Sequence, residues 1–399
     1  MTTVDLVWFN AGGGHRAAAQ ALEQVMVAQG RPWQVRRLNL TEVLDPTAAF
    51  QRVTGLAPED LYNRRLATGF TLGMTQELRL LQALIRLGHD SLVQRLARHW
   101  RATRPDLVVS LIPNFNRALH DSLALACPGV PFATVITDMV DHPPSFWIEP
   151  ATRQHLICGT DRAVEQALVA GCDPKRVYRS SGMVLRPEFH AAANASATVE
   201  AAAARAADRI AQGLDAEAPT GLVLFGGTGS RVMKRIAARL PDTPLILMCG
   251  RNAALADELR ALAAARTGAP RVVVGHTADV AGWMRRADFF IGKPGPGSLS
   301  EAVQMGLPVI VTRNAWTLPQ ERWNTEWVQQ HGLGVVLRRF AAVREAVAEV
   351  TAGLPAYRQR ARAIRNRAVF EVPEILQRIL DGRAPAVAER AADTSISSS

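Results

Sequence analysis

The sequence predicts an α/β protein with two doubly wound, Rossmann-like domains. Short apolar runs of about four to six residues alternate with longer segments in which Ala, Leu and Arg recur at helical spacing. Such runs are typical of buried parallel strands in βα units. At 399 residues the chain exceeds what one hydrophobic core usually serves, so two domains are expected. A glycine-rich turn follows the first strand of each half, where a doubly wound sheet opens its ligand crevice.

The apolar runs fall into two groups. The predicted strands are Asp5–Phe9, Leu107–Leu111 and Phe132–Thr137 in the first group, and Gly221–Phe225, Leu245–Cys249, Arg271–Val274, Phe289–Ile291 and Pro308–Val311 in the second. Between the groups, at residues 191–219, an Ala-rich stretch predicts one helix. We therefore expect domains at 1–190 and 191–383. Residues 384–399, rich in Ala, Ser and Thr, are expected to form a disordered tail.

Composition narrows the class of protein. Apolar residues make up 48% and charged residues 21% of the chain, which indicates a globular protein. The four cysteines form no CxxC pair, which argues against a zinc site or a disulfide framework and suits a reducing cytoplasm. We see no signal peptide and no apolar run of about eighteen residues that could span a bilayer. A soluble or peripheral protein is expected.

The net charge of +10 does not identify a partner. Only three of the 46 basic residues are lysines, and codon bias in a GC-rich genome explains this as well as function does. The sequence contains no helix-turn-helix, zinc-finger or RNA-binding motif, so we expect no nucleic-acid partner. An anionic membrane surface or a diphosphate substrate suits the charge equally.

The first glycine turn contains a candidate base. Gly12, Gly13, Gly14, His15 and Arg16 lie between the first strand and a helix predicted at 17–29. Backbone N–H groups of such a turn can approach a ligand, and the helix N-terminus adds partial positive charge. That charge should lower the pKa of His15 and keep its imidazole neutral, able to accept a proton. A tight structural turn is the alternative.

Two further glycine turns lie in the second half. Gly226–Ser230 joins a strand to a helix predicted at 231–240, and its glycines and hydroxyls suit a diphosphate. Lys293–Glu301 reads Lys-Pro-Gly-Pro-Gly-Ser-Leu-Ser-Glu. Ser298 and Glu301 have the spacing of a capping box, which is a structural alternative. A carboxylate at a helix start could instead accept hydrogen bonds from both ribose hydroxyls.

Together these motifs resemble the GT-B glycosyltransferases that make galactosyl- or glucosyldiacylglycerol, relatives of the peptidoglycan N-acetylglucosamine transferase. The resemblance spans roughly residues 5–340. Its motifs are the turn at 12–16, Val135–Asp138 through His142-Pro143, Trp147, Gly182–Phe189, Phe225–Ser230, Gly292–Pro308, Leu318–Asn324 and Gly332–Gly334. It implies two Rossmann-like domains facing across a cleft, with UDP bound by the C-terminal one and the acceptor by the N-terminal one.

The resemblance also implies roles for individual residues. Residues expected to hold the nucleotide sugar are Gly14, Gly227, Thr228, Gly229, Ser230, Pro296, Gly297, Ser298 and Glu301, with Glu301 on the ribose. His276 and Thr277 would lie against the uracil. Gln320, Glu321 and Asn324 would reach the sugar hydroxyls; a solvated loop is the alternative, and the nearby tryptophans Trp316, Trp323 and Trp327 favour a buried wall instead. Residues 313–318 depart from the family pattern, so the resemblance does not name the sugar.

The implied reaction is inverting transfer of a hexose from a UDP-sugar to a hydroxyl acceptor. It needs a base for that hydroxyl and charge compensation for the departing diphosphate. His15 and Asp138 are the leading candidates for the base, and His142 is the third. No D-x-D motif lies beside a nucleotide turn, so we expect no metal and no cofactor. A loop-capping role is the alternative for Asp138.

Residues 50–104 are the candidate membrane-facing segment. Nine arginines against four acids give a balance of +5, and leucines recur at helical spacing between residues 78 and 96. A basic amphipathic helix is typical of an interfacial segment on anionic lipid, although a core-facing helix with a solvated basic side gives the same pattern. With the family resemblance, this favours a lipid acceptor such as diacylglycerol and a cytoplasmic protein on the inner face of the cell membrane.

Two other functions remain open at this point. A UDP-sugar 2-epimerase has the same architecture but needs neither acceptor pocket nor membrane face. A non-catalytic nucleotide-sugar sensor would keep the fold alone, although His15, Asp138 and Glu321 argue mildly against it.

Overall fold

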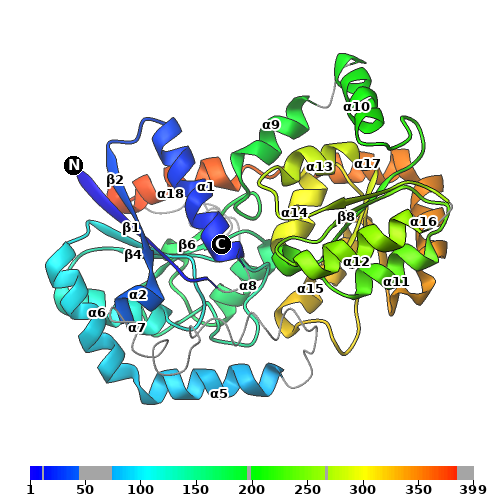
Figure 1. Cartoon of the computed structure of the whole chain (residues 1–399). Helices are drawn as coiled ribbons and strands as arrows, with labels where there is room; N and C mark the ends of the chain where they lie inside the picture. Colours follow the sequence, from blue (N-terminus) through cyan, green and yellow to red (C-terminus); the bar gives the residue numbers. More distant parts are fainter. Residues whose placement is uncertain (11–12, 45–73, 196–198, 266–267, 384–399) are drawn as a thin grey trace, which may run out of the picture. The chain divides into compact units, whose positions relative to one another are not determined.

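The computed structural model describes residues 1–10, 13–44, 74–195, 199–265 and 268–383 (Figure 1). The chain forms two compact units. The first contains the described residues up to Arg186 and those from Asn366 onward, and the second runs from Pro187 to Arg365. Each unit is built on its own six-stranded sheet, and all the strand pairs within both sheets are parallel. The predicted fold class is confirmed.

The first unit has the strand order β2-β1-β3-β4-β5-β6. Its strands are β1 Thr2–Trp8, β2 Trp33–Asn39, β3 Leu107–Ser110, β4 Phe132–Val135, β5 His155–Cys158 and β6 Val177–Arg179. Its helices are α1 Gly14–Ala28, α2 Leu40–Leu44, α5 Met74–Leu87, α6 His89–Thr103, α7 Asn116–Ala126, α8 Asp161–Val169, the short η1 Pro174–Arg176 and α18 Ala368–Leu380. Because the strands are parallel, the loops after β1, β3 and β4 all leave the same edge of the sheet.

The C-terminal helix α18 belongs to the core of the first unit. Val369, Val372 and Leu376 are fully buried there, in one apolar cluster with Leu22 of α1 and Leu6 of β1. Figure 1 shows α18 beside α1. The sequence division assigned residues 366–383 to the second domain, because periodicity along a chain identifies an amphipathic helix but not the sheet on which it packs. The expected tail, 384–399, lies outside the described residues.

The second unit has the strand order β12-β11-β10-β7-β8-β9. Its strands are β7 Gly221–Leu224, β8 Leu245–Met248, β9 Arg271–Val274, β10 Phe289–Gly292, β11 Val309–Thr312 and β12 Gly334–Leu337. Its helices are α9 Pro187–Ala195, α10 Val199–Ala211, η2 Gly226–Thr228, α11 Val232–Arg239, α12 Ala253–Ala264, α13 Val280–Arg286, α14 Pro296–Gln304, η3 Pro319–Glu321, α15 Arg322–Gln330, η4 Phe340–Ala342, α16 Val343–Ala352 and α17 Leu354–Ala363. The first strand, β7, lies between β8 and β10, so the strand order reverses there, where open α/β sheets bind ligands.

The Ala-rich stretch forms two helices, not the single one predicted. Helix α9 contacts α13 and α14, whereas α10 contacts α13. Arg205 and Arg209 of α10 both donate to the buried carboxylate of Asp288, which also accepts from Arg358. The bonds to Asp288 hold α10 in its own position. Helical periodicity in the sequence does not show where one helix ends and the next begins.

None of the helices within the described ranges is long and apolar enough to cross a bilayer.

Candidate functional site

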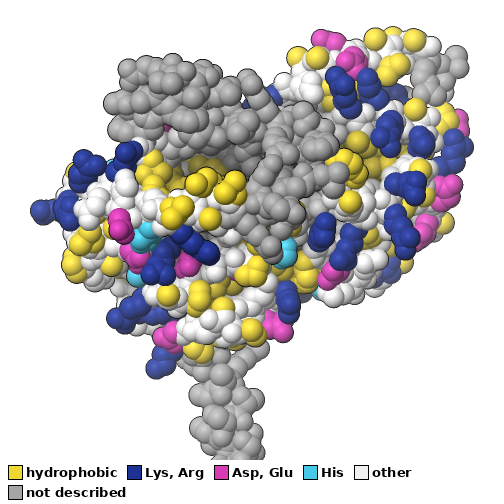
Figure 2. Space-filling model, turned by 90° about the horizontal axis from the view of Figure 1, so that it is seen from below, with side chains coloured by type: hydrophobic (Ala, Val, Ile, Leu, Met, Phe, Trp, Pro, Cys, Tyr) yellow, Lys and Arg dark blue, Asp and Glu magenta, His cyan; other side chains and the backbone are white. Residues whose placement is uncertain are grey.

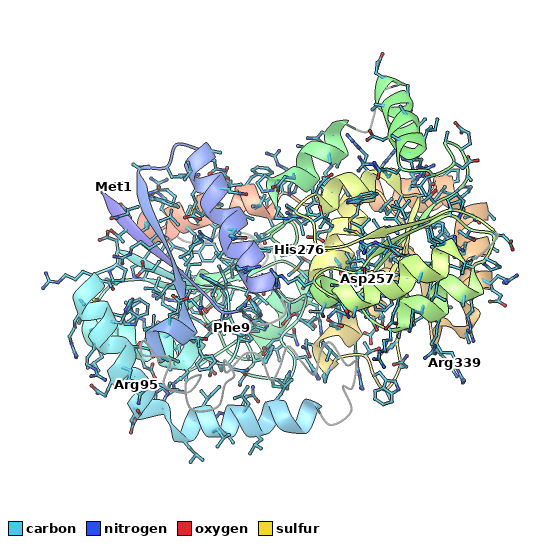
Figure 3. All side chains as sticks on the ribbon, viewed as in Figure 1. Met1, Phe9, Arg95, Asp257, His276 and Arg339 are labelled. Carbon is cyan, nitrogen blue, oxygen red and sulfur yellow. The ribbon has the colours of Figure 1, made fainter. Side chains whose placement is uncertain are left out.

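The candidate catalytic residues of the first unit lie at the carboxyl ends of β1 and β4. Gly13 has a left-handed backbone, with φ of 84°, and ends the turn from which α1 begins at Gly14. His15 is therefore in the first turn of α1. Its ring lies 4.9 Å from the ring of Phe9, which directly follows β1 (Figure 3), and its Nδ1 lies 3.1 Å from the hydroxyl of Thr137. Gly12 lies outside the described residues.

The surroundings of His15 favour its neutral imidazole at physiological pH. Burial lowers the pKa of His15 to about 4, and a hydrogen bond to the backbone of Leu111 opposes the shift only in part. The sequence predicted the direction of this shift but attributed it to the helix dipole. The main cause is removal from water, which disfavours the imidazolium.

Trp147 brings the two leading base candidates into one cluster. Its indole Nε1 donates to Asp138 Oδ2 at 3.0 Å, and its ring centroid lies 5.9 Å from that of His15. The indole is fully buried, and the side-chain amide of Asn116 donates to the Trp147 carbonyl at 3.0 Å. Asp138 itself lies just after β4 and is partly exposed. His15 and Asp138 thus share one rigid neighbour.

Asp141 holds the loop that carries Trp147. Its carboxylate accepts the backbone N–H of Trp147 at 2.7 Å and that of Ser145 at 3.1 Å. The side-chain amide of Gln166 holds the backbone of Asp141. Gln166 Oε1 accepts the Asp141 N–H, and Gln166 Nε2 donates to the Asp141 carbonyl, both at 2.9 Å. Burial raises the pKa of Asp141 to about 6, against the lowering effect of the backbone N–H groups. Asp141 is 6% exposed, so its role is to position the loop.

The third base candidate, His142, is exposed and precedes a cis peptide bond to Pro143. It lies in the same loop as Asp141 but outside the Trp147 contacts described above.

In the second unit, the turn after β7 has the form expected of a phosphate cradle. Gly226 and Gly229 have φ of 70° and 60°, a backbone that other residues adopt only with strain. Gly250, after the neighbouring β8, lies so close that a Cβ there would overlap the Gly227 carbonyl. The Arg251 N–H donates to that carbonyl at 2.8 Å. Gly227 is exposed and Thr228 partly exposed, so the ligand side of the turn is open.

Ser230 has a structural role in this turn. Its Oγ accepts the N–H of Val232 at 3.3 Å, at the start of α11. The same hydroxyl still has a proton to donate to a diphosphate.

The loop after β10 lies beside that turn, because β10 and β7 are neighbouring strands. Gly292 pairs with Leu224, and a Cβ on Gly292 would lie 2.5 Å from the Leu224 carbonyl oxygen. Helix α14 begins at Pro296 with Gly295 as its N-cap, and no side chain caps it. Ser298 therefore lies inside the helix, so the capping-box alternative is wrong. Pro296, Gly297, Ser298 and Glu301 occupy the first two turns of α14.

The sugar-binding candidates are buried, not solvated as the alternative supposed. Asn324 is fully buried, and Gln320 and Glu321 are 6% and 4% exposed. Asn324 Nδ2 donates to the carbonyl of Pro294 at 2.7 Å, which joins α15 to the β10 loop. Among the described residues, Gln320 Oε1 and Asn324 Oδ1 are buried without a hydrogen-bond partner. Two unpaired acceptors beside a carboxylate suit a ligand rich in hydroxyl donors.

The tryptophans do not form the buried wall that the sequence favoured. Trp316 is 46% exposed, and Trp323 and Trp327 are partly buried. The wall is polar instead, formed by the 3-10 turn η3 and the start of α15.

The uracil candidates lie in the loop after β9. His276 is exposed at the surface of the second unit (Figure 3). Thr277 Oγ1 accepts the N–H of Asp279 at 3.0 Å, and Asp279 in turn caps α13 through Gly282. Side-chain hydrogen bonds thus shape the loop. Its backbone N–H and C=O groups are the ones that could contact a uracil ring.

Sequence reasoning assigned no role to Lys293 or Asp141. Lys293 Nζ donates to Glu321 Oε1 at 2.7 Å. One signal was present, since Lys293 is one of only three lysines in the chain. Within the described residues, no group of three or more His, Cys, Asp or Glu side chains is arranged to hold a metal ion.

Comparison with known proteins defines the fold. No protein-family model matches the chain. Over nearly their full lengths, the chain superposes on MurG from Acinetobacter baumannii with a TM-score of 0.52 at 13% identity, covering 99% of each chain. It superposes on the UDP-GlcNAc 2-epimerase of Neisseria meningitidis with a TM-score of 0.57 at 13% identity, covering 96% of this chain and 100% of that one. These likenesses show the GT-B fold.

Sequence relatives narrow the class. A probable monogalactosyldiacylglycerol synthase 2 of Oryza sativa subsp. indica is 26% identical over 349 residues, which are 82% of this chain and 68% of that protein. The monogalactosyldiacylglycerol synthase of Spinacia oleracea is 26% identical over 360 residues, 85% of this chain and 64% of that protein. The chain is a glycosyltransferase of the GT-B fold. Its curated homologues are the monogalactosyldiacylglycerol synthases.

Proposed function

We propose that this protein transfers a hexose, with inversion, from a UDP-hexose to a hydroxyl group of a lipid acceptor of the diacylglycerol type. One observation carries the donor side of the proposal: Gln320, Glu321 and Asn324 are buried polar residues beside the β10 loop, and Gln320 Oε1 and Asn324 Oδ1 have no hydrogen-bond partner. A hexose supplies hydroxyl donors to such a set. The two relatives are named as monogalactosyldiacylglycerol synthases, which supports an acceptor of the diacylglycerol type.

The second unit would bind the donor. The Gly226–Ser230 turn and the N-terminus of α14 present backbone N–H groups and helix dipoles to the diphosphate. Glu301 would accept from the ribose hydroxyls, and backbone groups near His276 and Thr277 would contact the uracil. These groups can compensate the charge of departing UDP without a metal ion. We therefore expect donor binding to survive EDTA.

The first unit would activate the acceptor. The acceptor hydroxyl attacks the anomeric carbon while His15 or Asp138 takes its proton, and the C–O bond to UDP breaks with its electron pair leaving on the diphosphate. A neutral His15 and a Trp147-bound Asp138 are both compatible with this role. His142, exposed and outside that cluster, ranks below them.

Helix α5 would meet the membrane. Leu80, Leu81, Leu84 and Leu87, here named the α5 leucine stripe, are 61%, 42%, 56% and 86% exposed. At these spacings they lie on one side of the helix. Figure 2 views the molecule from the side of α5 and shows hydrophobic side chains gathered there beside basic ones. An apolar stripe with basic neighbours suits an anionic lipid surface.

The opposite side of α5 connects the stripe to the acceptor loop. Leu78 is buried in a cluster with Phe146 and Trp147, and Gln82 Nε2 donates to the Ser145 carbonyl at 3.3 Å. A lipid reaching the protein along α5 would therefore arrive beside the loop that holds Asp138. An epimerase has no need of this arrangement, which favours the transferase over that rival.

The deciding experiment uses the full chain with vesicles that contain diacylglycerol and with radiolabelled UDP-glucose, UDP-galactose or UDP-N-acetylglucosamine. Labelled lipid from one of these donors supports the proposal, with EDTA as the test of metal independence. An isomerised sugar nucleotide without labelled lipid would establish the epimerase, and binding without turnover the sensor. If His15→Ala and Asp138→Ala both transferred at the wild-type rate, the assignment of the base would be wrong.

A further inference from the structure

The side chain of Lys293 runs between the two glycine turns of the second unit. A Cβ on Gly295 would lie 3.3 Å from Lys293 Cε, and one on Gly226 would lie 3.8 Å from the same atom. Glycine at both positions leaves room for the four-carbon stem. The loop after β10 thereby directs the ammonium of Lys293 towards η3, which contains Glu321.

The ammonium of Lys293 meets the buried carboxylate of Glu321. The distance from Nζ to Oε1 is 2.7 Å, and the side chains of Lys293 and Glu321 are 36% and 6% exposed. Burying a carboxylate without a partner is costly, and the ammonium of Lys293 is the partner that Glu321 has in this structure. The oxygens of a carboxylate accept hydrogen bonds and donate none.

The Lys293–Glu321 pair also fixes the orientation of the second carboxylate oxygen of Glu321, Oε2. Oε1 is occupied by Lys293, so the lone pairs of Oε2 remain for a ligand, next in the chain to the unpartnered Oε1 of Gln320. Asn324, tied to the Pro294 carbonyl, holds the base of the same loop. Two acceptors of fixed orientation can select two neighbouring hydroxyls of a sugar.

We propose that Lys293 is a positioning residue for donor-sugar recognition, acting through Glu321 without touching the sugar. This inference rests on the proposed function, because it presumes a UDP-hexose at the site. Its consequence is specific: the affinity for the hexose depends on Lys293, and the affinity for the UDP portion does not.

The test compares UDP with UDP-glucose and UDP-galactose by titration calorimetry on the full chain. Lys293→Met, which keeps the stem and removes the charge, should weaken binding of the preferred UDP-hexose about tenfold and leave UDP binding unchanged. Glu321→Gln should have the same effect. The double variant should be no worse than either single one, because both remove one interaction. Lys293→Arg should restore much of the loss.

Lys234→Met is the matched control. Lys234 pairs with Glu258 at 2.5 Å on the outer surface of the same unit, and its loss should change neither affinity. If Lys293→Met weakened UDP and UDP-hexose equally, Lys293 would be a diphosphate contact and the inference would fall. Unchanged hexose affinity would also overturn it.

Folding and the proposed function are controlled separately. If circular dichroism shows that Lys293→Met does not fold, the affinities for UDP and the UDP-hexose are compared in Lys293→Arg and Glu321→Gln instead. An unchanged affinity for the UDP-hexose in Glu321→Gln would then overturn the inference. A wild-type protein that bound neither UDP nor a UDP-hexose would instead refute the proposed function.

Discussion

The indole nitrogen of Trp147 donates a 3.0 Å hydrogen bond to the carboxylate of Asp138, and the same indole lies 5.9 Å from the ring of His15. One buried side chain therefore fixes the neighbourhood of both candidate bases. Its backbone is fixed in turn by Asp141. These residues are thus linked in sequence, from the buried carboxylate of Asp141 through the indole of Trp147 to the partly exposed Asp138.

Trp147→Phe tests this arrangement. Phenylalanine keeps most of the ring but removes the N–H donor, so Asp138 loses a charge-assisted hydrogen bond of about 1.5–3 kcal/mol. We expect kcat for lipid transfer to fall about tenfold or more, with KM for the UDP-hexose unchanged. Steady-state kinetics at varied donor concentration measures both. A KM effect without a kcat effect would contradict the role given to Trp147.

The titration of His15 gives a pH prediction. Its pKa in the folded protein, about 4, lies below the ordinary value of 6.5, so the unfolded chain takes up the proton first. Stability is therefore lost as pH falls from 6.5 towards 4 and is unaffected above 6.5. His15→Gln should flatten this part of the curve in urea titrations, while His155, whose pKa is also lowered to about 4, remains in both proteins. A titration of His15 near 6.5 by NMR would refute the prediction.

The pKa of Asp141 is shifted in the opposite direction to that of His15. Its pKa in the folded protein, about 6, is raised above the ordinary 3.8, so the folded state binds the proton more tightly. The stability from this group is present at low pH and is lost as pH rises through 6. The free energy of unfolding of the wild type, minus that of Asp141→Asn, should therefore fall as pH rises from about 3.8 to about 6. A difference that rose or stayed constant over that range would be inconsistent with a buried, protonatable Asp141.

Gly250 is the test position for the Gly226–Ser230 turn, and Gly213 is its control. Both have left-handed backbones, with φ of 58° and 72°, but a Cβ on Gly250 would overlap the Gly227 carbonyl whereas nothing lies within 4 Å of one on Gly213. Alanine at either position adds backbone strain of about 1–2 kcal/mol. Only Gly250→Ala should also displace the turn and weaken UDP binding, about tenfold or more by calorimetry. Equal UDP affinities in the two variants would argue against a phosphate site at this turn.

The α5 leucine stripe predicts a membrane phenotype. Leu84→Asp should weaken binding to vesicles of phosphatidylcholine and phosphatidylglycerol about tenfold or more, since burying one leucine contributes about 1.5–3 kcal/mol. Val169→Asp is the control, because Val169 is 83% exposed and lies on α8, not on α5. Co-sedimentation with the vesicles measures both. Equal losses of vesicle binding in the two variants would mean that the added negative charge weakens binding at any surface position, and that the α5 leucine stripe has no special role.

Local patterns predicted most strands and the glycine turns, because buried parallel strands are continuous apolar runs and tight βα turns need glycine. The strands β2, β5, β6 and β12 were not among the predicted ones. The sequence of β2, Trp-Gln-Val-Arg-Arg-Leu-Asn, suits a partly exposed edge. Contacts between distant segments were not predictable from one sequence. The Lys293–Glu321 pair, the Trp147–Asp138 bond and the packing of α18 depend on which loops the topology brings together.

The placement of α18 has a consequence for the order in which the chain folds during synthesis. Among the described residues, the second unit lies within the range 187–365, whereas the core of the first unit needs Val369, Val372 and Leu376, which follow that range. On the ribosome, the second unit can therefore complete its core while the apolar side chains of α1 and β1 in the first unit still lack the partners that α18 supplies. A nascent chain arrested before residue 366 would carry a finished second unit and an unfinished first unit with exposed apolar surface, which chaperones bind.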